Sequence, residues 1–258
     1  MGILAATAIF SSLAGFMTSY RLLRAKTRKT RILAVLLLSI LALPALSFSI
    51  YYFHVLPEKA WFYALRSWPG VEILAVFLGA AAGASAALIP RIFLILPLGI
   101  SLAITVMPYL KPFINPLKTR DLKEQWKDEA CLQSTESTCG PASTATILRF
   151  LGTDVSESEI AHAAYSSASG TEAWYLARYL RSQGFRTQFD FQQTFSPTVS
   201  LPAIVGVRTG GFGHFIAILK IDNETVTFAD PLHGKQERKL SSFTKAYTFS
   251  GFHLSVTK

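Results

Sequence analysis

Acidic side chains are almost absent from the first 120 residues of this 258-residue chain. This part contains 2 Asp and Glu residues against 12 Lys and Arg, whereas residues 121–258 contain 14 against 13. The net charge of +9 therefore comes from the first part, which also holds the long apolar runs. Basic residues beside apolar runs are typical of segments that flank a membrane, so we expect no nucleic-acid partner.

Metal ligands in paired spacing are also lacking. The histidines are scattered along the chain without the spacing of a metal site: His54, His162, His214, His233 and His253. We therefore expect neither a metal ion nor a cofactor.

Cysteine is scarce as well, since only Cys131 and Cys139 are present. A bridge between them would close a small loop and block both thiols, so it could act as a redox switch. The alternative is that Cys131 is an unpaired thiol buried in the core.

Four apolar runs are each long enough to cross a bilayer, which takes about 17–25 residues. They are residues 3–20, 32–52, 71–89 and 92–109. Gly79 and Gly83 in the third run have the GxxxG spacing that lets a second helix approach closely, although a small-residue helix without such a contact has the same composition. We predict a transmembrane α-helical region of about four spans over residues 1–110.

The orientation of these spans is suggested by the basic residues. Six of them lie between the first two runs, within residues 21–31, and such a cluster is expected to stay in the cytoplasm. Four spans would then place the C-terminal part outside, in a multi-pass protein of the cytoplasmic (inner) membrane. The opposite orientation stays open, because a re-entrant run next to the short Pro90-Arg91 turn would move this part to the cytoplasm.

Residues 111–129 have the composition of a juxtamembrane linker, and residues 130–258 are numerous enough for one compact domain. Helix signals come first in this domain: Pro141 suits a first helical turn, Ser156 and Glu159 form a capping box, and a third helix ends near Gly184. Runs rich in β-branched and aromatic residues follow at 185–191, 201–207, 215–221, 225–228 and 252–256. This order predicts an α+β domain with an antiparallel sheet.

Four residues of the domain could form a nucleophilic site. Cys139 lies at the start of the first predicted helix, where the helix dipole and a nearby imidazolium would lower the thiol pKa. His214 enters a strand from the glycine-rich segment 210–213, and Asp230 closes the next strand, where it could orient the imidazole. Gln133 could donate its amide N–H to an oxyanion.

Each of the four residues also has a simpler interpretation, as a packed thiol, a strand-end histidine, a turn aspartate or a loop amide. Their order along the chain favours a Cys/His/Asp relay. Gly140 and Gly213, which adjoin Cys139 and His214, are candidates for binding the substrate.

These residues resemble the C39 and C39-like (bacteriocin-processing) cysteine peptidases of papain type. The resemblance covers roughly residues 131–258. It rests on Gln133, the Cys-Gly-Pro-Ala run at 139–142, Gly213-His214-Phe215 and Ala229-Asp230-Pro231. It implies a papain-like fold, with Cys139 as nucleophile, His214 as base, Asp230 as orienting acid and Gln133 in the oxyanion hole.

Exporter-linked members of that family cut a leader peptide after a Gly-Gly pair at the cytoplasmic face. The present sequence contains no Walker-type loop, its membrane part precedes the peptidase part, and Thr138 stands where an Asp often precedes the nucleophile.

We therefore expect a membrane-anchored cysteine peptidase that cleaves a peptide or protein near the bilayer. Its expected partners are that substrate and the lipid bilayer. Two alternatives stay open. One is an acyl-transfer enzyme such as an amidase, deamidase or transglutaminase-like protein, because an amine can resolve a thioester as well as water can. The other is an inactive peptide-binding subunit that assembles with other subunits of a membrane complex.

Overall fold

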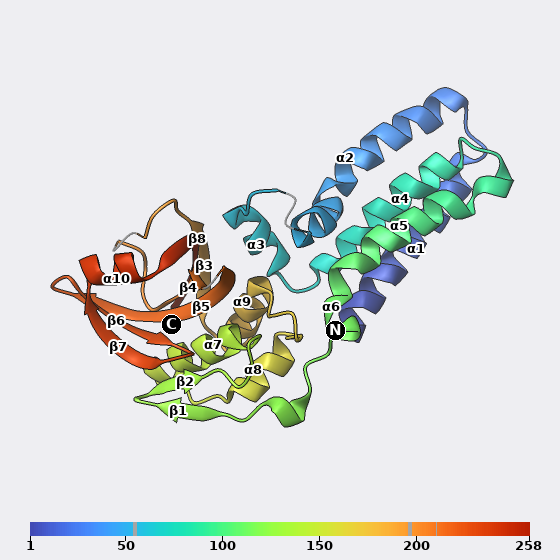
Figure 1. Ribbon diagram of the computed structural model, residues 1–258. Helices are drawn as coiled ribbons and strands as arrows, with labels where there is room; N and C mark the ends of the chain where they lie inside the picture. The colour runs from blue at the N-terminus through green and yellow to red at the C-terminus, as the bar shows by residue number, and fades with distance from the viewer. Residues whose placement is uncertain (54–55, 196–197, 210) are drawn as a thin grey trace. The chain divides into compact units, whose positions relative to one another are not determined.

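The computed structural model describes residues 1–53, 56–195, 198–209 and 211–258 (Figure 1). Two compact units make up the chain: residues 1–58 with 68–113, and residues 59–67 with 114–258. The segment 59–67 thus belongs to the second unit although apolar runs lie on both sides of it in the sequence. The boundaries 1–110, 111–129 and 130–258 stay predictions, and His54 and Gly210 lie outside the described residues.

Helices make up the first unit. They are α1 (Gly2–Leu23), α2 (Arg28–Tyr52), η1 (Val71–Leu74), α4 (Ala75–Ala86), η2 (Arg91–Phe93), α5 (Ile95–Val106) and η3 (Met107–Tyr109), followed by the short α6 (Lys111–Ile114). Within the described residues, Gly2–Leu23, Arg28–Tyr52 and Arg91–Tyr109 are long and apolar enough to cross a membrane. A fourth crossing segment is obtained if Ala60–Arg66 and Val71–Ala86, which are bent by 103° to one another, count together. The predicted helical region of about four apolar segments is confirmed.

Glycines bring α1 and α4 into backbone contact. A Cβ atom added at Gly79 would lie 1.8 Å from the carbonyl oxygen of Ser12, and one at Gly83 would lie 2.3 Å from that of Phe16. On α1, a Cβ at Gly15 would lie 2.0 Å from the carbonyl oxygen of Val76. The close approach suggested by the GxxxG spacing is therefore present. Because residue numbers rise together along both helices at these contacts, α1 and α4 run in parallel.

The Arg31 side chain links the ends of two helices at one end of the first unit. Its guanidinium donates through Nε to the carbonyl oxygen of Leu23 at 3.1 Å, through Nη2 to that of Arg24 at 2.6 Å, and through Nη1 to that of Ala87 at 2.6 Å. The positive charge thus lies against the C-terminal ends of α1 and α4, where the helix dipole favours a cation. At the opposite end, the Ser49 hydroxyl near the end of α2 donates to the carbonyl oxygen of Ile104 near the end of α5 at 2.6 Å.

The second unit is the predicted α+β domain. Its helices are α3 (Ala60–Arg66), the 3-10 turn η4 (Thr119–Asp121), α7 (Cys139–Phe150), α8 (Glu157–Ala163), α9 (Ala173–Ser182) and α10 (Leu240–Ala246). Its strands are β1 (Gln125–Lys127), β2 (Ala130–Leu132), β3 (Arg186–Phe191), β4 (Ala203–Thr209), β5 (Phe212–Asp222), β6 (Thr225–Asp230), β7 (Gly234–Lys239) and β8 (Thr248–Thr257). The last six form one antiparallel sheet in the order β3-β8-β4-β5-β6-β7, and β1 and β2 form a separate hairpin.

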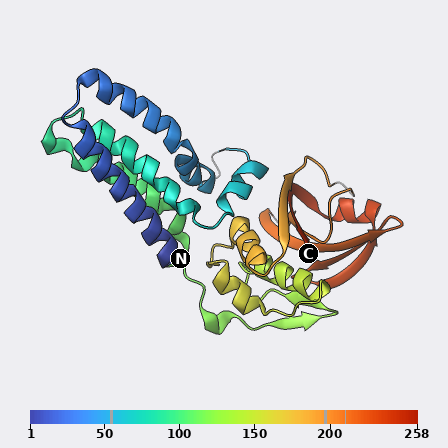
Figure 2. The same cartoon turned by 180° about the vertical axis from the view of Figure 1, so that it is seen from behind.

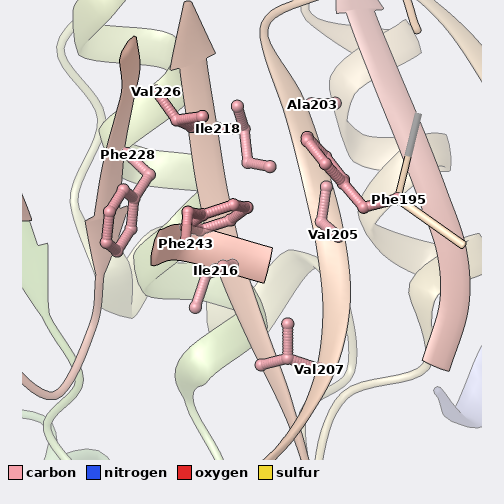
Figure 3. Close-up of a cluster of buried hydrophobic side chains, with 9 residues drawn as sticks. All are labelled: Phe195, Ala203, Val205, Val207, Ile216, Ile218, Val226, Phe228 and Phe243. Carbon is pink, nitrogen blue, oxygen red and sulfur yellow. The ribbon is translucent and has the colours of Figure 1, made fainter. Parts of the chain in front are cut away.

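The main sheet is covered on both faces by helices (Figure 2). On one face, α10 closes a cluster of nine buried residues (Figure 3): Phe195, Ala203, Val205, Val207, Ile216, Ile218, Val226, Phe228 and Phe243. On the other face, the side chain of Phe215 lies under the start of α7, and the Ser143 hydroxyl donates to the Phe215 carbonyl oxygen at 3.1 Å. Successive side chains of β5 therefore point to opposite faces of the sheet, as in any β-strand, and pack against different helices.

Aromatic side chains hold α3 within the second unit. The Tyr63 ring lies 5.2–5.7 Å, between centroids, from the rings of Trp174, Phe189, Phe191 and Phe252. Arg66 is fully buried, and its Nη2 donates to the Tyr175 hydroxyl at 3.2 Å. The short helix thus fills an apolar recess formed by α9, β3 and β8.

The contact between α1 and α4 yields a paired test. Gly79→Ala should destabilise the folded protein by about 1–3 kcal/mol, because its new methyl group meets backbone atoms that have no room to move. The matched change Gly99→Ala on α5 meets no atom within 4 Å and should be neutral or stabilising by up to about 1 kcal/mol, the usual helix preference for alanine. Thermal unfolding in detergent measures both; equal melting temperatures would contradict the backbone contact.

Candidate active site

Cys139 is the first residue of α7 and is partly exposed. The turn before it is closed by Thr138, whose hydroxyl accepts the N–H of Thr135 at 3.0 Å and donates to its carbonyl oxygen at 3.1 Å. The Thr138 carbonyl oxygen accepts the N–H of Ala142 at 3.0 Å and so starts the helix. Cys139 therefore occupies the positive end of the helix dipole, and its own N–H lies outside the ladder of intrahelical bonds.

Adjacent antiparallel strands bring His214 and Asp230 together. His214 lies near the start of β5 and Asp230 ends β6, so both lie at the same end of the sheet. The His214 Nε2 atom is 2.9 Å from Oδ1 of Asp230, and both side chains are buried. Because the carboxylate only accepts, Nε2 carries the proton.

The surroundings of His214 favour the protonated imidazole. Burial alone would lower the pKa of His214, but the hydrogen bonds and charges of Asp230 and Cys139 outweigh it and raise that pKa to about 9. Since Nε2 is bonded to Asp230, Nδ1 is the ring nitrogen left for the Cys139 thiol. The structure thus brings together the three residues predicted for the relay, in the order thiol, imidazole, carboxylate.

Two further side chains, not predicted from the sequence, contact Asp230. The Tyr247 hydroxyl lies 2.8 Å from Oδ2, and Nδ1 of His233 lies 3.1 Å from the same oxygen. The N–H of Leu232 donates to Oδ1 at 2.9 Å. Burial alone would raise the pKa of Asp230, but the hydrogen bonds from His214, Leu232 and Tyr247, together with the His214 charge, hold that pKa well below its usual range.

The signals for these two residues in the sequence are weak. His233 follows Asp230 by three residues, across the turn that Pro231 begins, and this short spacing could have indicated the contact. Tyr247 lies between α10 and β8, elements that no pattern links to Asp230.

Gln133 is brought beside the segment that carries Asp230. Its backbone N–H donates to the carbonyl oxygen of Pro231 at 3.0 Å, and its Nε2 donates to that of Thr135 at 2.9 Å. An amide nitrogen has two N–H groups, so one contact leaves one donor. The buried Oε1 has no hydrogen-bond partner among the described residues. The role of Gln133 as an oxyanion donor stays a prediction.

The loop that carries Gln133 is fixed by a buried carboxylate. Glu157, the first residue of α8, accepts the N–H of Ser134 at 2.9 Å and also its hydroxyl. The predicted capping box of this helix is confirmed, since the Ser156 hydroxyl accepts the N–H of Glu159 at 3.1 Å.

The remaining predicted residues differ in their surroundings. Gly140 is buried, and a Cβ atom there would lie 2.9 Å from Cδ1 of Leu176. Gly213 is exposed, and a Cβ atom there would meet nothing within 4 Å. Substrate binding by these two glycines stays a prediction.

Cys131 and Cys139 are both free thiols in the structure. Cys131 is fully buried, and its N–H donates to the Thr146 hydroxyl at 2.9 Å. Burial first, and then the charges of Glu157 and Glu124, raises the pKa of the Cys131 thiol well above its ordinary value. Of the two, Cys139 is therefore the thiol suited to nucleophilic chemistry. Within the described ranges, no three His, Cys, Asp or Glu residues are grouped so that they could hold a metal ion.

Comparisons with known proteins concern the second unit. Residues 127–258 match the model of the peptidase C39 family. An uncharacterised protein of Methanothermobacter marburgensis is 33% identical over 129 residues, which are 50% of this chain and 89% of that protein. The probable functional amyloid protease FapD of Pseudomonas aeruginosa is 24% identical over 139 residues, 50% of this chain and 62% of its own length. Among solved structures, the peptidase domain of the bifunctional ABC transporter ComA of Streptococcus superposes with a TM-score of 0.41 and 17% identity, over 53% of this chain and 98% of that domain.

The charge on His214 can be measured directly. Folding raises its pKa from 6.5 to about 9, so the protonated imidazole stabilises the second unit below pH 6.5, and this contribution is lost as the pH rises through about 9. NMR titration of the histidine-labelled full-length chain should therefore place the His214 midpoint near pH 9, and Asp230→Asn should lower it by about 1–3 pH units. Asp154→Asn, which removes an exposed carboxylate paired with Arg149, serves as the matched control. A wild-type midpoint near 6.5 would contradict the paired geometry.

Proposed function

The chain belongs to the peptidase C39 family, and we propose that its second unit is a cysteine peptidase that cleaves a peptide or protein substrate near a membrane. The observation that carries this proposal is the hydrogen bond from His214 to Asp230 at 2.9 Å, together with the nearness of Cys139, which contributes to the raised pKa of the same imidazole. A thiol at a helix start that shares a proton with a carboxylate-bound imidazole is an activated nucleophile.

In the proposed mechanism, the proton of the Cys139 thiol has already moved to Nδ1 of His214, so that a thiolate beside an imidazolium meets the substrate. The sulfur forms a bond to the carbonyl carbon of the scissile peptide bond, and the carbonyl electrons move to the oxygen. When the C–N bond breaks, the imidazolium of His214 transfers its proton to the leaving amine, and a thioester remains on Cys139. His214 then takes a proton from a water molecule, whose oxygen attacks the thioester and releases the acid and the thiol.

Hydrogen-bond donors must stabilise the negative charge that develops on the carbonyl oxygen. The N–H of Cys139 supports this role because it is the first N–H of α7 and lies at the positive end of the helix. The second N–H of the Gln133 amide supplies a further donor, and the bonds of its loop to Pro231 and Glu157 would limit its motion. Removal of one such donor typically costs about 10²- to 10³-fold in rate.

Attachment to the membrane follows from the chain connections of the second unit. Segment 59–67 lies between α2 and η1 in the sequence, and residues 114–258 follow α5, so the unit is connected to the apolar first unit at three places. These connections leave no long linker between the units, which would confine cleavage to sites close to the bilayer surface.

We further propose that the peptidase unit lies outside the cytoplasm. The loop between α1 and α2 is rich in Lys and Arg, and the bond from Arg31 to Ala87 puts the turn after α4, with Arg91, at the same end of the helical unit. Basic loops are retained in the cytoplasm. The ends of α2 and α5 lie at the other end and lead into the two parts of the second unit, so one orientation satisfies both connections.

Product analysis tests the peptidase proposal. Full-length protein in detergent is incubated with a randomised peptide pool, and the products are identified by mass spectrometry. Cys139→Ala and His214→Ala should lower kcat/KM by about 10³-fold or more, and Gln133→Ala by about 10²- to 10³-fold. Cys131→Ala is the matched control for the thiol. Cleavage that survives Cys139→Ala would refute the mechanism, and amide adducts formed from an added amine, in place of hydrolysis products, would indicate acyl transfer instead.

Thiol accessibility tests the orientation. In a background of Cys131→Ala and Cys139→Ala, the exposed positions Lys29 and Glu237 are changed to Cys one at a time. A membrane-impermeant maleimide added to intact cells should label Glu237→Cys, whereas Lys29→Cys should require permeabilisation. The reverse pattern would place the peptidase unit in the cytoplasm.

A further inference from the structure

The carboxylate of Asp230 has two oxygen atoms, and the mechanism above uses only Oδ1. The second oxygen, Oδ2, has contacts of its own: the Tyr247 hydroxyl at 2.8 Å and Nδ1 of His233 at 3.1 Å. Together with His214 and the N–H of Leu232 on Oδ1, four donors surround the group. A carboxylate offers about four lone-pair sites, so this one is fully occupied.

We propose that Tyr247 and His233 are positioning residues of the peptidase site, which hold Oδ2 of Asp230 so that Oδ1 stays directed at Nε2 of His214. This inference rests on the proposed peptidase function and adds two residues to it. The reason is geometric. The carboxylate cannot turn about its Cβ–Cγ bond without breaking contacts at both oxygens, so the imidazole that it orients is fixed in turn.

Tyr247 is well suited to this role because its ring is anchored. The ring centroid lies 5.4 Å from that of Phe243 and 5.7 Å from that of Phe228, and both of these residues belong to the buried cluster under α10. Burial, followed by the charge and hydrogen bond of Asp230, raises the pKa of Tyr247, so the phenol keeps the proton that it donates. The core of the sheet thus positions a hydroxyl at the site.

His233 is held through its backbone rather than by burial. Its N–H donates to the Asp230 carbonyl oxygen at 2.9 Å, and its own carbonyl oxygen accepts Nζ of Lys127 at 3.3 Å. The side chain itself is 62% exposed. Because Asp230 only accepts, Nδ1 must carry the proton in this contact. Water competes for an exposed donor, so His233 should contribute less than Tyr247.

The two residues should act only through Asp230. Tyr247→Phe keeps the ring and removes one donor. It should lower the rate at which Cys139 is alkylated by about 3- to 10-fold, and His233→Gln should lower the same rate by about 2-fold. Asp230→Asn should lower it further. In the double variant Tyr247→Phe/Asp230→Asn, the rate should equal that of Asp230→Asn alone, because the hydroxyl has lost the group that it positions.

Alkylation of the full-length protein in detergent by iodoacetamide at pH 6 measures this rate at Cys139. Tyr179→Phe is the matched control, since Tyr179 also donates to a carboxylate, Glu159, at 2.9 Å but is not part of the site. Circular dichroism and thermal unfolding verify that each variant is folded. A structural role alone would lower the melting temperature of a variant without changing its alkylation rate.

The outcomes separate the two levels of the proposal. If wild-type Cys139 reacts rapidly at pH 6 and slows in Asp230→Asn, but Tyr247→Phe equals wild type or adds its full effect to that of Asp230→Asn, the positioning role is refuted and the peptidase proposal stands. If wild-type Cys139 reacts like an ordinary thiol, both are refuted. The inference is supported only by a slower Tyr247→Phe whose effect disappears in the double variant.

Discussion

The buried carboxylate of Asp230 is the constraint around which the second unit is organised. A charged side chain that is buried loses its hydration. Unless a counter-charge and hydrogen bonds compensate, the free energy of that loss destabilises the folded protein. Here the partners come from the neighbouring strand β5, the turn after β6 and the junction of α10 and β8. The register of β5 against β6 and the packing of α10 on the sheet are therefore conditions for neutralising this one group. The same conditions place the imidazole of His214, whose pKa they raise, beside the start of α7.

The helix that bears Cys139 is fixed to the sheet independently of that charge. Gly140 allows Leu176 of α9 and Phe215 of β5 to close on the helix start, and the Ser143 hydroxyl ties the next turn to the Phe215 carbonyl group. Phe215 is the neighbour of His214, so one strand residue supports the nucleophile and the next supplies the base. Neighbouring residues of β5 thus position both Cys139 and His214.

Short patterns in the sequence predicted much of this arrangement, because they report local requirements. The start of α7 at Cys139, the capping box at Ser156 and the strands that carry His214 and Asp230 depend on neighbouring residues alone, and the structure contains all of them. The features that the sequence did not predict depend on residues that are far apart in the chain. Strand β7 is a polar edge strand, Gly-Lys-Gln-Glu-Arg-Lys, with none of the apolar alternation that identifies a strand. Tyr247 contacts Asp230 only because α10 folds back over the sheet, and α3 joins the second unit through aromatic contacts that no local pattern reports.

The place of α3 in the chain has a consequence for biosynthesis. Tyr63 leaves the ribosome long before the residues that surround it, since Phe189 and Phe191 follow more than 120 residues later and Phe252 about 190 residues later. At roughly 5–20 residues per second, α3 is without its full set of aromatic neighbours for on the order of 10–40 s while the rest of the chain is synthesised. During that interval its apolar face is available to chaperones or to the lipid surface. The recess that holds α3 is therefore incomplete until β8, which carries Phe252, has been synthesised.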